Sequence, residues 1–272
     1  MWRSNHLSRR MAVLLFLILA APFSAAATTI AVTLPPLAGI VKMLDATVEV
    51  TCLLPAAADP HHFQLQPRKI ELLQQADLLV RASYDDGGWP LPPLHNNTLD
   101  LWPARDHGWL SPAAVREALP HLAKALIALN PTNSRSIEGR LAAAIRATET
   151  LEQAWRKALA PLHNSGVVMQ HPAWKRLMDE LNVPVLAVLE SGHHGHEHGP
   201  HALDEALQTL ADHPDALLLQ DAAHINRALD WLAAKSGNNT RMATLNALGD
   251  CGSSWDQFME ANLNSLNGAL QP

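Results

Sequence analysis

The chain has 272 residues, of which 48% are hydrophobic and 17% are charged, and its formal net charge is -6 with histidine neutral. This length suits one large domain or two smaller lobes, and the apolar content excludes a chain that is disordered throughout. The negative charge argues against a nucleic acid or an anionic membrane as partner, because both require a basic surface. Small or cationic ligands are more compatible with this composition.

The first 27 residues have the order of features that is typical of a secretory signal peptide. Three arginines precede the apolar run "MAVLLFLILAAPF", and the small residues "SAAATT" follow it. The apolar run is too short for a permanent membrane anchor, and no cysteine near the cleavage region signals a lipid anchor. We therefore expect residues 1–27 to be removed and the product to be a soluble periplasmic protein.

Residues 28–112 alternate between strand and helix patterns and form the first predicted lobe. The β-branched runs "TTIAVTLPPL" and "TVEVTCLLP" predict strands that end at proline, and "ADLLVRAS" and "LDLWP" predict two more. Between them, "PRKIELLQQ" begins with Pro67 and has apolar residues at helical spacing. This alternation predicts a parallel sheet flanked by helices.

Residues 113–164 are rich in Ala, Leu, Glu, Lys and Arg. A Ser-Pro pair precedes them and "NPTN" interrupts them once, which predicts one helix and then a long helix from about Ser134 to Leu159. The second helix is longer than a usual crossover between strands. We interpret it as a rigid rod that joins two lobes.

Residues 165–272 return to the alternation and form the second predicted lobe. A last helix is expected from about Trp255 to Leu270. The fold is therefore predicted to be α/β, with two βα lobes that have parallel sheets, a long helix between them and a site in the cleft between the lobes. The strand patterns are "GVVMQ", "VPVLAVL", "DALLLQ" and "RMATLNALG", and the helix patterns between them are "PAWKRLMDELN", "ALDEALQTLADH" and "INRALDWLAAKSG".

Histidines follow predicted strands in both lobes. His61 and His62 lie in the loop after the second strand, His107 follows the fourth strand, and His171 ends the first strand of the second lobe. Ligands of open α/β sheets bind beyond the carboxyl ends of the strands, so these loops are expected to converge on one cleft. Three imidazoles are typical of a site for zinc.

Three motifs resemble the periplasmic metal-binding subunits of bacterial ABC importers for zinc and manganese, especially those of the zinc branch. "ADPHHFQLQPRKIELLQQADLLV" resembles the family's Asp/Ser-Pro-His block, "DHGWLSP" its His-x-Trp-Leu-x-Pro block, and "HPAWKRLMDELNV" the block that begins with His and continues as a helix. The resemblance covers essentially the whole chain after the signal peptide. It implies that His61, His107 and His171 are the three imidazole ligands.

The same resemblance implies the function and the partners. We expect a high-affinity binding protein, without a chemical step, that captures Zn(II) and delivers it to the membrane permease of an ABC importer. Mn(II) is the less favoured ion. A periplasmic zinc chaperone is a second candidate partner, and the protein is expected to be a monomer.

One position departs from the pattern of the family. Its members usually have an Asp in a Leu-Asp-Pro-Leu-Gly segment after the last strand, where this sequence has "TLNALG" with Asn246. A neutral amide is a poor zinc ligand, so the fourth ligand stays open. Water is the simplest candidate, and the candidates from the protein besides Asn246 are Asp221, Asp250, Glu190 and His62.

The segment 191–201, "SGHHGHEHGPH", contains five histidines between glycines. Mobile imidazoles bind zinc weakly but rapidly, so we expect this segment to collect metal or to pass it to the cleft. Two alternatives stay open, a solvated loop without function and a loop that supplies the fourth ligand. The histidines are His193, His194, His196, His198 and His201.

Two cysteines, Cys52 and Cys251, are present in the chain. An even number of cysteines in an exported protein favours a disulfide. Both could instead be small buried hydrophobic residues. The sequence does not provide the Cα separation that a disulfide requires, so both interpretations stay open.

Aromatic and acidic residues near the predicted cleft have two interpretations each. Trp89, Trp109 and Trp174 either line the cleft or pack in the core. The segment Tyr84–Asp86 forms either an acidic rim for cation capture or a turn.

Two other functions use the same residues. Three histidines with an open fourth position also describe a zinc hydrolase with an activated water. Glu190 or Asp221 would be its general base, although no motif pairs either with a ligand at catalytic spacing. A periplasmic zinc buffer or metallochaperone without a transporter is the other alternative.

Overall fold

The computed structural model describes residues 28–271, except for 56–57, 61–62, 94–96, 191–199, 223–226 and 238–239. The predicted signal peptide lies outside these residues. Within the described part of the chain, no helix is both long enough and apolar enough to cross a membrane.

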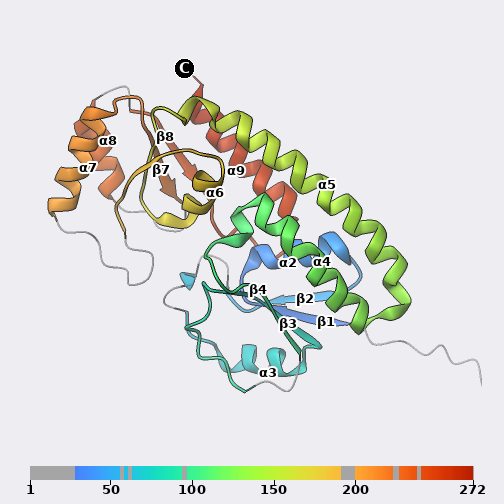
Figure 1. Ribbon diagram of the computed structural model, residues 1–272. Coiled ribbons are helices and arrows are strands. Elements are labelled where there is room, and N and C mark those ends of the chain that lie inside the picture. Colours follow the sequence, from blue (N-terminus) through green and yellow to red (C-terminus); the bar gives the residue numbers. More distant parts are fainter. Residues whose placement is uncertain are drawn as a thin grey trace, which may run out of the picture.

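The first lobe contains a four-stranded parallel sheet. Its elements are β1 (Thr29–Val32), α2 (Pro35–Leu44), β2 (Glu49–Cys52), α3 (Pro67–Gln75), β3 (Leu78–Ser83) and β4 (Asn97–Trp102). The strand order is β2-β1-β3-β4, with α2 on one face of the sheet and α3 on the other (Figure 1). The parallel pairing confirms the α/β class that the alternating patterns predict.

Helix α2 is missing from the sequence prediction. The run "TTIAVTLPPL" predicts one strand, but β1 ends at Val32 and α2 begins at Pro35. Proline suits the first turn of a helix, because an N–H group would have no partner within the helix there. The two prolines therefore mark the beginning of a helix, whereas the sequence prediction used them only as the end of a strand.

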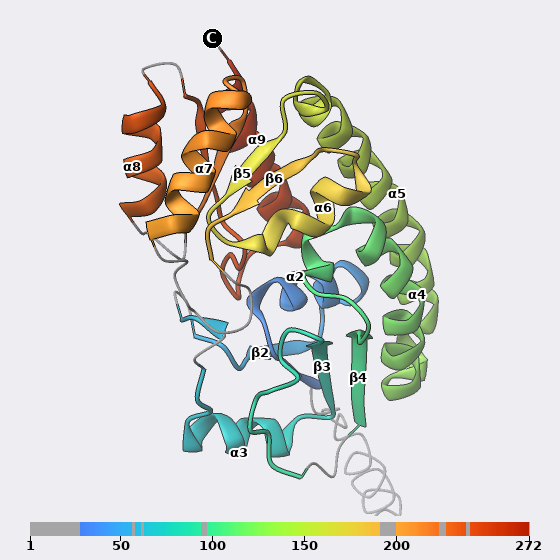
Figure 2. The same ribbon diagram turned by 60° about the vertical axis from the view of Figure 1, so that its left-hand side comes forward.

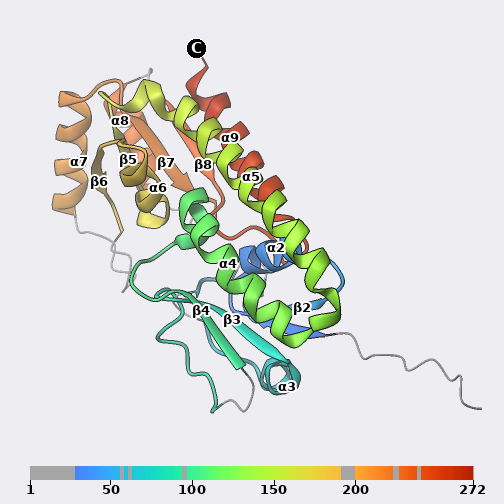
Figure 3. The same ribbon diagram turned by 45° about the vertical axis from the view of Figure 1, so that its right-hand side comes forward.

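Two helices, α4 (Pro112–Leu129) and α5 (Ser134–Leu159), connect the sheets, and α5 has the bounds predicted from the sequence. Ser111 caps α4, because its Oγ accepts the backbone N–H of Ala114 at 3.0 Å. Helix α5 contacts α2 of the first lobe and also α9 (Trp255–Leu270), and it extends alongside both lobes (Figure 3).

The second lobe contains another four-stranded parallel sheet, in the order β6-β5-β7-β8. Val168 and Leu218 belong to a small core with residues of two outer helices, whereas Met169 and Leu219 belong to the main core, as expected for side chains that alternate between the faces of a sheet. The predicted helix after His171 is a 3-10 turn followed by a short α-helix. The elements are β5 (Val167–Met169), α6 (Lys175–Glu180), β6 (Val185–Val188), α7 (Pro200–Asp212), β7 (Leu217–Asp221), α8 (Arg227–Ser236), β8 (Met242–Leu245) and α9. The outer helices, α7 and α8, lie beside this sheet (Figure 2).

The main core is continuous from the first sheet to the inner face of the second sheet. Trp255, at the start of α9, is fully buried, and its Nε1 donates to the carbonyl oxygen of Trp109 at 2.7 Å. Trp109 Nε1 in turn donates to the carbonyl oxygen of Ala247 at 2.7 Å. A Cβ atom at Gly39 of α2 would lie 2.6 Å from the Trp255 nitrogen. The two lobes are therefore packed closely on the side of α2 and α9.

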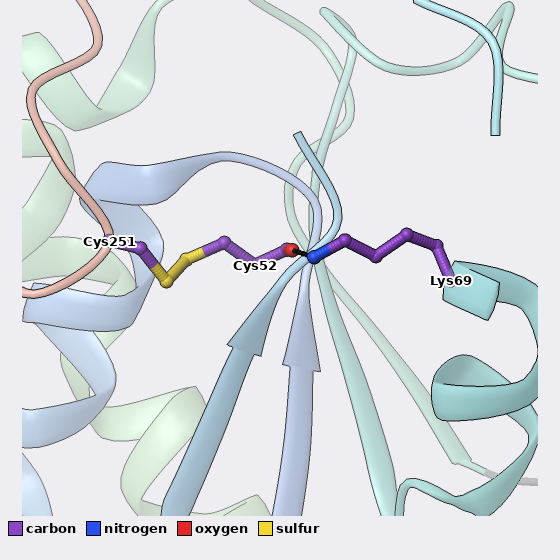
Figure 4. Close-up of a disulfide and its surroundings, with 3 residues drawn as sticks. All are labelled: Cys52, Lys69 and Cys251. Atoms are coloured by element: carbon purple, nitrogen blue, oxygen red, sulfur yellow. Dashed lines mark hydrogen bonds between the residues drawn. A yellow bond between two sulfur atoms is a disulfide. The ribbon is translucent and has the colours of Figure 1, made fainter. Parts of the chain in front are cut away.

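A disulfide joins Cys52 to Cys251, with a Cα separation of 6.0 Å (Figure 4). Cys52 ends β2 in the first lobe, and Cys251 lies between β8 and α9, 199 positions later. The Nζ of Lys69, in α3, donates a hydrogen bond to the carbonyl oxygen of Cys52. The disulfide therefore links the two lobes, and α3 is attached at the same point.

Candidate metal site

His107 lies between β4 and the 3-10 turn Gly108–Leu110, with a left-handed backbone at φ 49°. Such a conformation is uncommon for a residue other than glycine and needs local support. The backbone N–H of His107 donates to both carboxylate oxygens of Asp85, at 3.1 Å each. Asp85 follows β3, which pairs with β4, so adjacent strand ends bring the two residues together.

Two carboxylates face the ring of His107. Its Nδ1 lies 3.2 Å from Asp106 Oδ2 and 3.6 Å from Asp85 Oδ1. A carboxylate at Nδ1 favours the tautomer that has its proton there, which leaves Nε2 unprotonated for a metal ion. The 3.2 Å approach of Asp106 is compatible with this arrangement, although Nδ1 makes no well-aligned hydrogen bond with a described residue.

The pKa values of the two carboxyl groups are shifted in opposite directions. Burial raises the pKa of Asp85 to about 6, although His107 beside it acts in the opposite direction. The pKa of Asp106 is lowered, chiefly by its contact with the His107 side chain, which offsets the effect of burial. His107 therefore acts to lower the pKa of both carboxyl groups, and burial outweighs this effect only at Asp85.

His171 follows the end of β5 and also lies near a carboxylate. Its Nδ1 lies 3.8 Å from Glu190 Oε2, and Glu190 Oε1 accepts a hydrogen bond from Gln170 Nε2 at 3.1 Å. Glu190 follows β6, which pairs with β5, and its backbone N–H donates to the carbonyl oxygen of Gln170 at 2.9 Å. The ring of His171 is thus placed by the end of its own strand and by the neighbouring one.

The structure brings His107 and His171 together. Their ring centroids are 6.0 Å apart, with an angle of 75° between the ring planes, and each residue is 7% exposed. His107 comes from the end of the first lobe and His171 from the beginning of the second. Two buried imidazoles therefore meet where the lobes meet.

The other predicted imidazoles lie outside the described residues. These are His61, His62, His193, His194, His196 and His198, and the side chain of His201 is not described either. Within the described part of the chain, no three His, Cys, Asp or Glu side chains form a group that could hold a metal ion. His107 and His171 by themselves supply two nitrogen donors, fewer than a zinc site requires.

Trp89 contacts Pro60 and Phe63, the residues on either side of His61 and His62. Its Nε1 donates to the carbonyl oxygen of Pro60 at 2.9 Å, and its ring centroid lies 4.3 Å from that of Phe63. Trp89 is 9% exposed, so it packs in the core rather than lining an open surface.

The candidates for the fourth ligand differ in their surroundings. Asp221 ends β7, the other neighbour of β5, and is 4% exposed. Asn246 Oδ1 accepts the backbone N–H groups of Leu248 at 3.0 Å and Gly249 at 2.8 Å, so this amide stabilises a turn. Asp250 is exposed.

Sequence reasoning missed the carboxylates around His107. It placed Asp85 in a rim or a turn and did not consider Asp106. The turn itself is formed by Asp86, whose carboxylate accepts the backbone N–H groups of Ala82 and Ser83 at 2.9 and 3.0 Å. The position of Asp85 directly after β3, beside the strand that leads to His107, was the signal that could have identified it.

The model of the ZnuA family, described as the periplasmic component A of the zinc-uptake complex, matches residues 30–269. A Thermotoga maritima protein whose name refers to metal binding is 30% identical over 196 residues, which cover 66% of this chain and 71% of that protein.

Solved structures share the fold at low sequence identity. A crystal structure of ZnuA has a TM-score of 0.77 and 22% identity, and the match covers 89% of this chain and 98% of that one. FpvC of Pseudomonas aeruginosa, in complex with Ni2+, has a TM-score of 0.72 and 22% identity, with coverages of 90% and 97%. The laminin-binding protein of Streptococcus agalactiae, described as an adhesin with metal-transporting activity, has a TM-score of 0.78 and 19% identity, with coverages of 90% and 100%.

Proposed function

We propose, since this chain belongs to the ZnuA family of periplasmic zinc-uptake components, that it captures Zn2+ in the periplasm and delivers the ion to the membrane permease of an ABC importer. The family is one of transport proteins that bind metal, not one of enzymes. We take residues 1–27 as the signal peptide that directs the chain there.

The observation that carries the proposal is the pair formed by His107 and His171. Each ring has a carboxylate near Nδ1 and can offer Nε2 to a shared ion. We propose His61 as the third imidazole, because Pro60 and Phe63 attach its loop to Trp89. Nitrogen donors suit zinc better than manganese, which prefers oxygen, so Zn2+ is the ion we propose.

The fourth ligand is a carboxylate or a water in this proposal. Glu190 and Asp221 are supported by their positions at the ends of β6 and β7, on either side of the strand that leads to His171. A carboxylate would also reduce the positive charge of the ion, which the amide of Asn246 cannot do. The amide oxygen of Asn246 is already engaged by two backbone N–H groups.

The histidine-rich segment 191–201 is proposed to collect zinc and pass it to this site. It follows Glu190 directly in the chain, so it begins beside the candidate ligands. Its weak, rapid binding would raise the local concentration of zinc without determining the affinity of the main site.

A zinc titration of the chain from Thr28 onwards tests these assignments. We expect one tight ion and additional weak ions in the wild type. His107→Ala should abolish the tight ion, and deletion of residues 193–201 should remove only the weak ones. If the deletion removes the tight ion and His107→Ala retains it, the pair of imidazoles is not the site. Retention of the bound ion after a challenge with Mn2+ and Ni2+ tests the preference for zinc.

A further inference from the structure

Helix α6 of the second lobe holds the segment that carries His107. Arg176 Nη1 donates to the carbonyl oxygen of Asp106 at 3.3 Å, and Arg176 Nε donates to Glu180 Oε1 at 2.9 Å. The other oxygen of the same carboxylate, Glu180 Oε2, accepts a hydrogen bond from Ser111 Oγ. Arg176 and Glu180 together therefore contact the segment 106–111 at both of its ends.

The two ends of this contact lie on either side of His107. Asp106 is the preceding residue, and its carboxylate lies beside the His107 ring. Ser111 follows the 3-10 turn and caps α4, so its position determines where α4 begins. The backbone at His107 is thus held by contacts from the second lobe as well as by contacts from its own lobe.

The helix that holds this segment is the one that follows His171. A 3-10 turn, Pro172–Trp174, leads from His171 directly into α6. His171 and Arg176 therefore belong to one short, locally ordered stretch of chain. A shift of α6 relative to the first lobe changes the separation of the two imidazoles.

A second, outer ion pair joins the same elements but differs in burial. Arg105 Nη2 lies 3.1 Å from Asp179 Oδ2, with side chains that are 45% and 39% exposed, whereas those of Arg176 and Glu180 are 10% and 24% exposed. Exposed pairs contribute little, because water and salt screen them and ordering their side chains costs entropy. Bonds to a shielded charged group contribute more. Of the two sets of contacts from α6, the inner one therefore holds the segment of His107 more strongly, and it adds to the buried hydrogen bonds of Trp109 with Ala247 and Trp255.

We propose that Arg176, acting with Glu180, is a positioning residue that sets the distance between His107 and His171 for a bound ion. The inference rests on the proposed function, because it assumes that these two imidazoles bind the same ion. Arg176 itself is not a ligand. Its loss should loosen the segment 106–111, so that the ion dissociates faster while the apo protein stays folded.

The test compares Arg176→Met with three other variants. Arg176→Met keeps the aliphatic stem and removes the hydrogen bonds. Arg176→Lys keeps the charge but lacks the planar guanidinium that donates to Glu180 and to the Asp106 carbonyl at the same time. Glu180→Gln interrupts the same contacts from the carboxylate and serves if the Arg176 variants do not fold. Asp179→Asn is the matched control, since it removes the exposed pairs of the same helix with Arg105 and Lys175.

Three measurements are made on each variant. The rate of Zn2+ release to a chelator reports the loss of the ion. The absorption spectrum of the Co2+ form reports the geometry of the ligands. Thermal unfolding of the apo protein reports stability alone.

We expect Arg176→Met to release Zn2+ roughly 10- to 100-fold faster, the range that is typical for groups that orient metal ligands, and to change the Co2+ spectrum. Arg176→Lys should restore part of the wild-type rate, and Asp179→Asn should release Zn2+ at the wild-type rate. Equal release from wild type, Arg176→Met and Glu180→Gln would overturn the inference, as would changes that Asp179→Asn reproduces. If His107→Ala abolishes tight binding while Arg176→Met has no effect, only this inference fails. If His107→Ala retains tight binding, the proposed site itself fails.

Discussion

The two lobes are joined in different ways at opposite edges of their sheets. At the β2 and β8 edges, the Cys52–Cys251 disulfide and the buried Trp255 join them. At the β4 edge, the hydrogen bonds of Arg176 and Glu180 and the exposed Arg105–Asp179 pair lie outside the buried contacts of Trp109 with Ala247 and Trp255. The first edge can open only if covalent and apolar contacts are disrupted. At the second edge, the hydrogen bonds of Arg176 and Glu180 can be exchanged for hydrogen bonds with water at a small net cost.

This difference indicates where a metal ion enters and leaves. We expect the disulfide edge to stay closed and the α6 edge to open by a small displacement. His107 and His171 lie beside the second edge, since His107 follows β4 and His171 leads into α6. Changes at the disulfide edge should therefore reduce stability, and changes at the α6 edge should alter metal exchange.

Trp255→Ala should have the largest effect on stability. Its fully buried indole packs in the main core and donates to the carbonyl oxygen of Trp109, so its loss leaves a cavity and an unpaired carbonyl. We expect the free energy of unfolding to fall by about 3–5 kcal/mol. Urea denaturation measures this change. Trp231→Ala, at a residue that is 39% exposed, is the control and should be close to the wild type. Equal losses in both variants would contradict the buried role of Trp255.

Replacing both cysteines by serine should have the next largest effect. The disulfide closes a long loop and so restricts the unfolded chain, and its removal is expected to cost about 2–4 kcal/mol. Zinc release should accelerate less than in Arg176→Met, because the polar edge stays intact. Denaturation and chelator kinetics on the same samples check both statements. A faster release than in Arg176→Met would place the moving edge at the disulfide instead.

Gly39→Ala tests the close contact between α2 and α9. The added methyl group would lie 2.6 Å from the backbone nitrogen of Trp255, so one helix has to shift. We expect a loss of about 1–3 kcal/mol, measured as a lower midpoint of thermal unfolding. Gly139→Ala is the matched control, because a Cβ there meets no atom within 4 Å and alanine favours a helix. Destabilisation by Gly139→Ala of the same size would show that space is not the cause.

Asp45→Asn should have the smallest effect and one that depends on pH. Burial raises the pKa of Asp45, but hydrogen bonds from Thr47 and Asn133 and the charge of Arg140 lower it by more, so the net pKa is lowered. The stabilisation by the carboxylate is therefore complete above its unfolded value near 3.8 and is lost as the pH falls through the lower folded value.

At neutral pH the Asp45→Asn variant should be less stable by on the order of 1–2 kcal/mol. Urea denaturation of both proteins from neutral pH to about pH 2 should show a constant difference down to the unfolded value near 3.8 and convergence of the two stabilities below it. A difference that stays constant over this range would contradict the assigned pKa direction. Zinc release at pH 7 should not change. Asp45 accepts a hydrogen bond from Asn133, in the turn that precedes α5, and this bond does not involve α6.

Local patterns predicted the elements that depend on local physics. The long helix from Ser134 to Leu159 has apolar residues at helical spacing, and the strands β3 and β7 are short apolar runs. The prediction failed at α2, where the β-branched residues before Pro35 concealed a helix start. Local preference is ambiguous at such a boundary, and packing of α2 against α5 and α9 decides it.

The candidate site was predictable to the extent that strand ends determine it. His107 and His171 were selected because ligands of open α/β sheets bind beyond the carboxyl ends of the strands, where loops of both lobes can converge, and the structure places their rings 6.0 Å apart. Asp106 and Arg176 were not selected. Their roles depend on how the second lobe is oriented against the first, and no spacing along the chain encodes that orientation.

The sequence by itself determined the α/β class, the two strand-and-helix regions and the long helix between them, because hydrophobic periodicity and proline placement act over a few residues. Only the tertiary structure decided that Cys52 reaches Cys251, that Asp85 supports His107, and that α6 holds the segment 106–111. Each of these depends on the separation and direction of side chains that are far apart in the chain. Those quantities are set by the packing of the whole core.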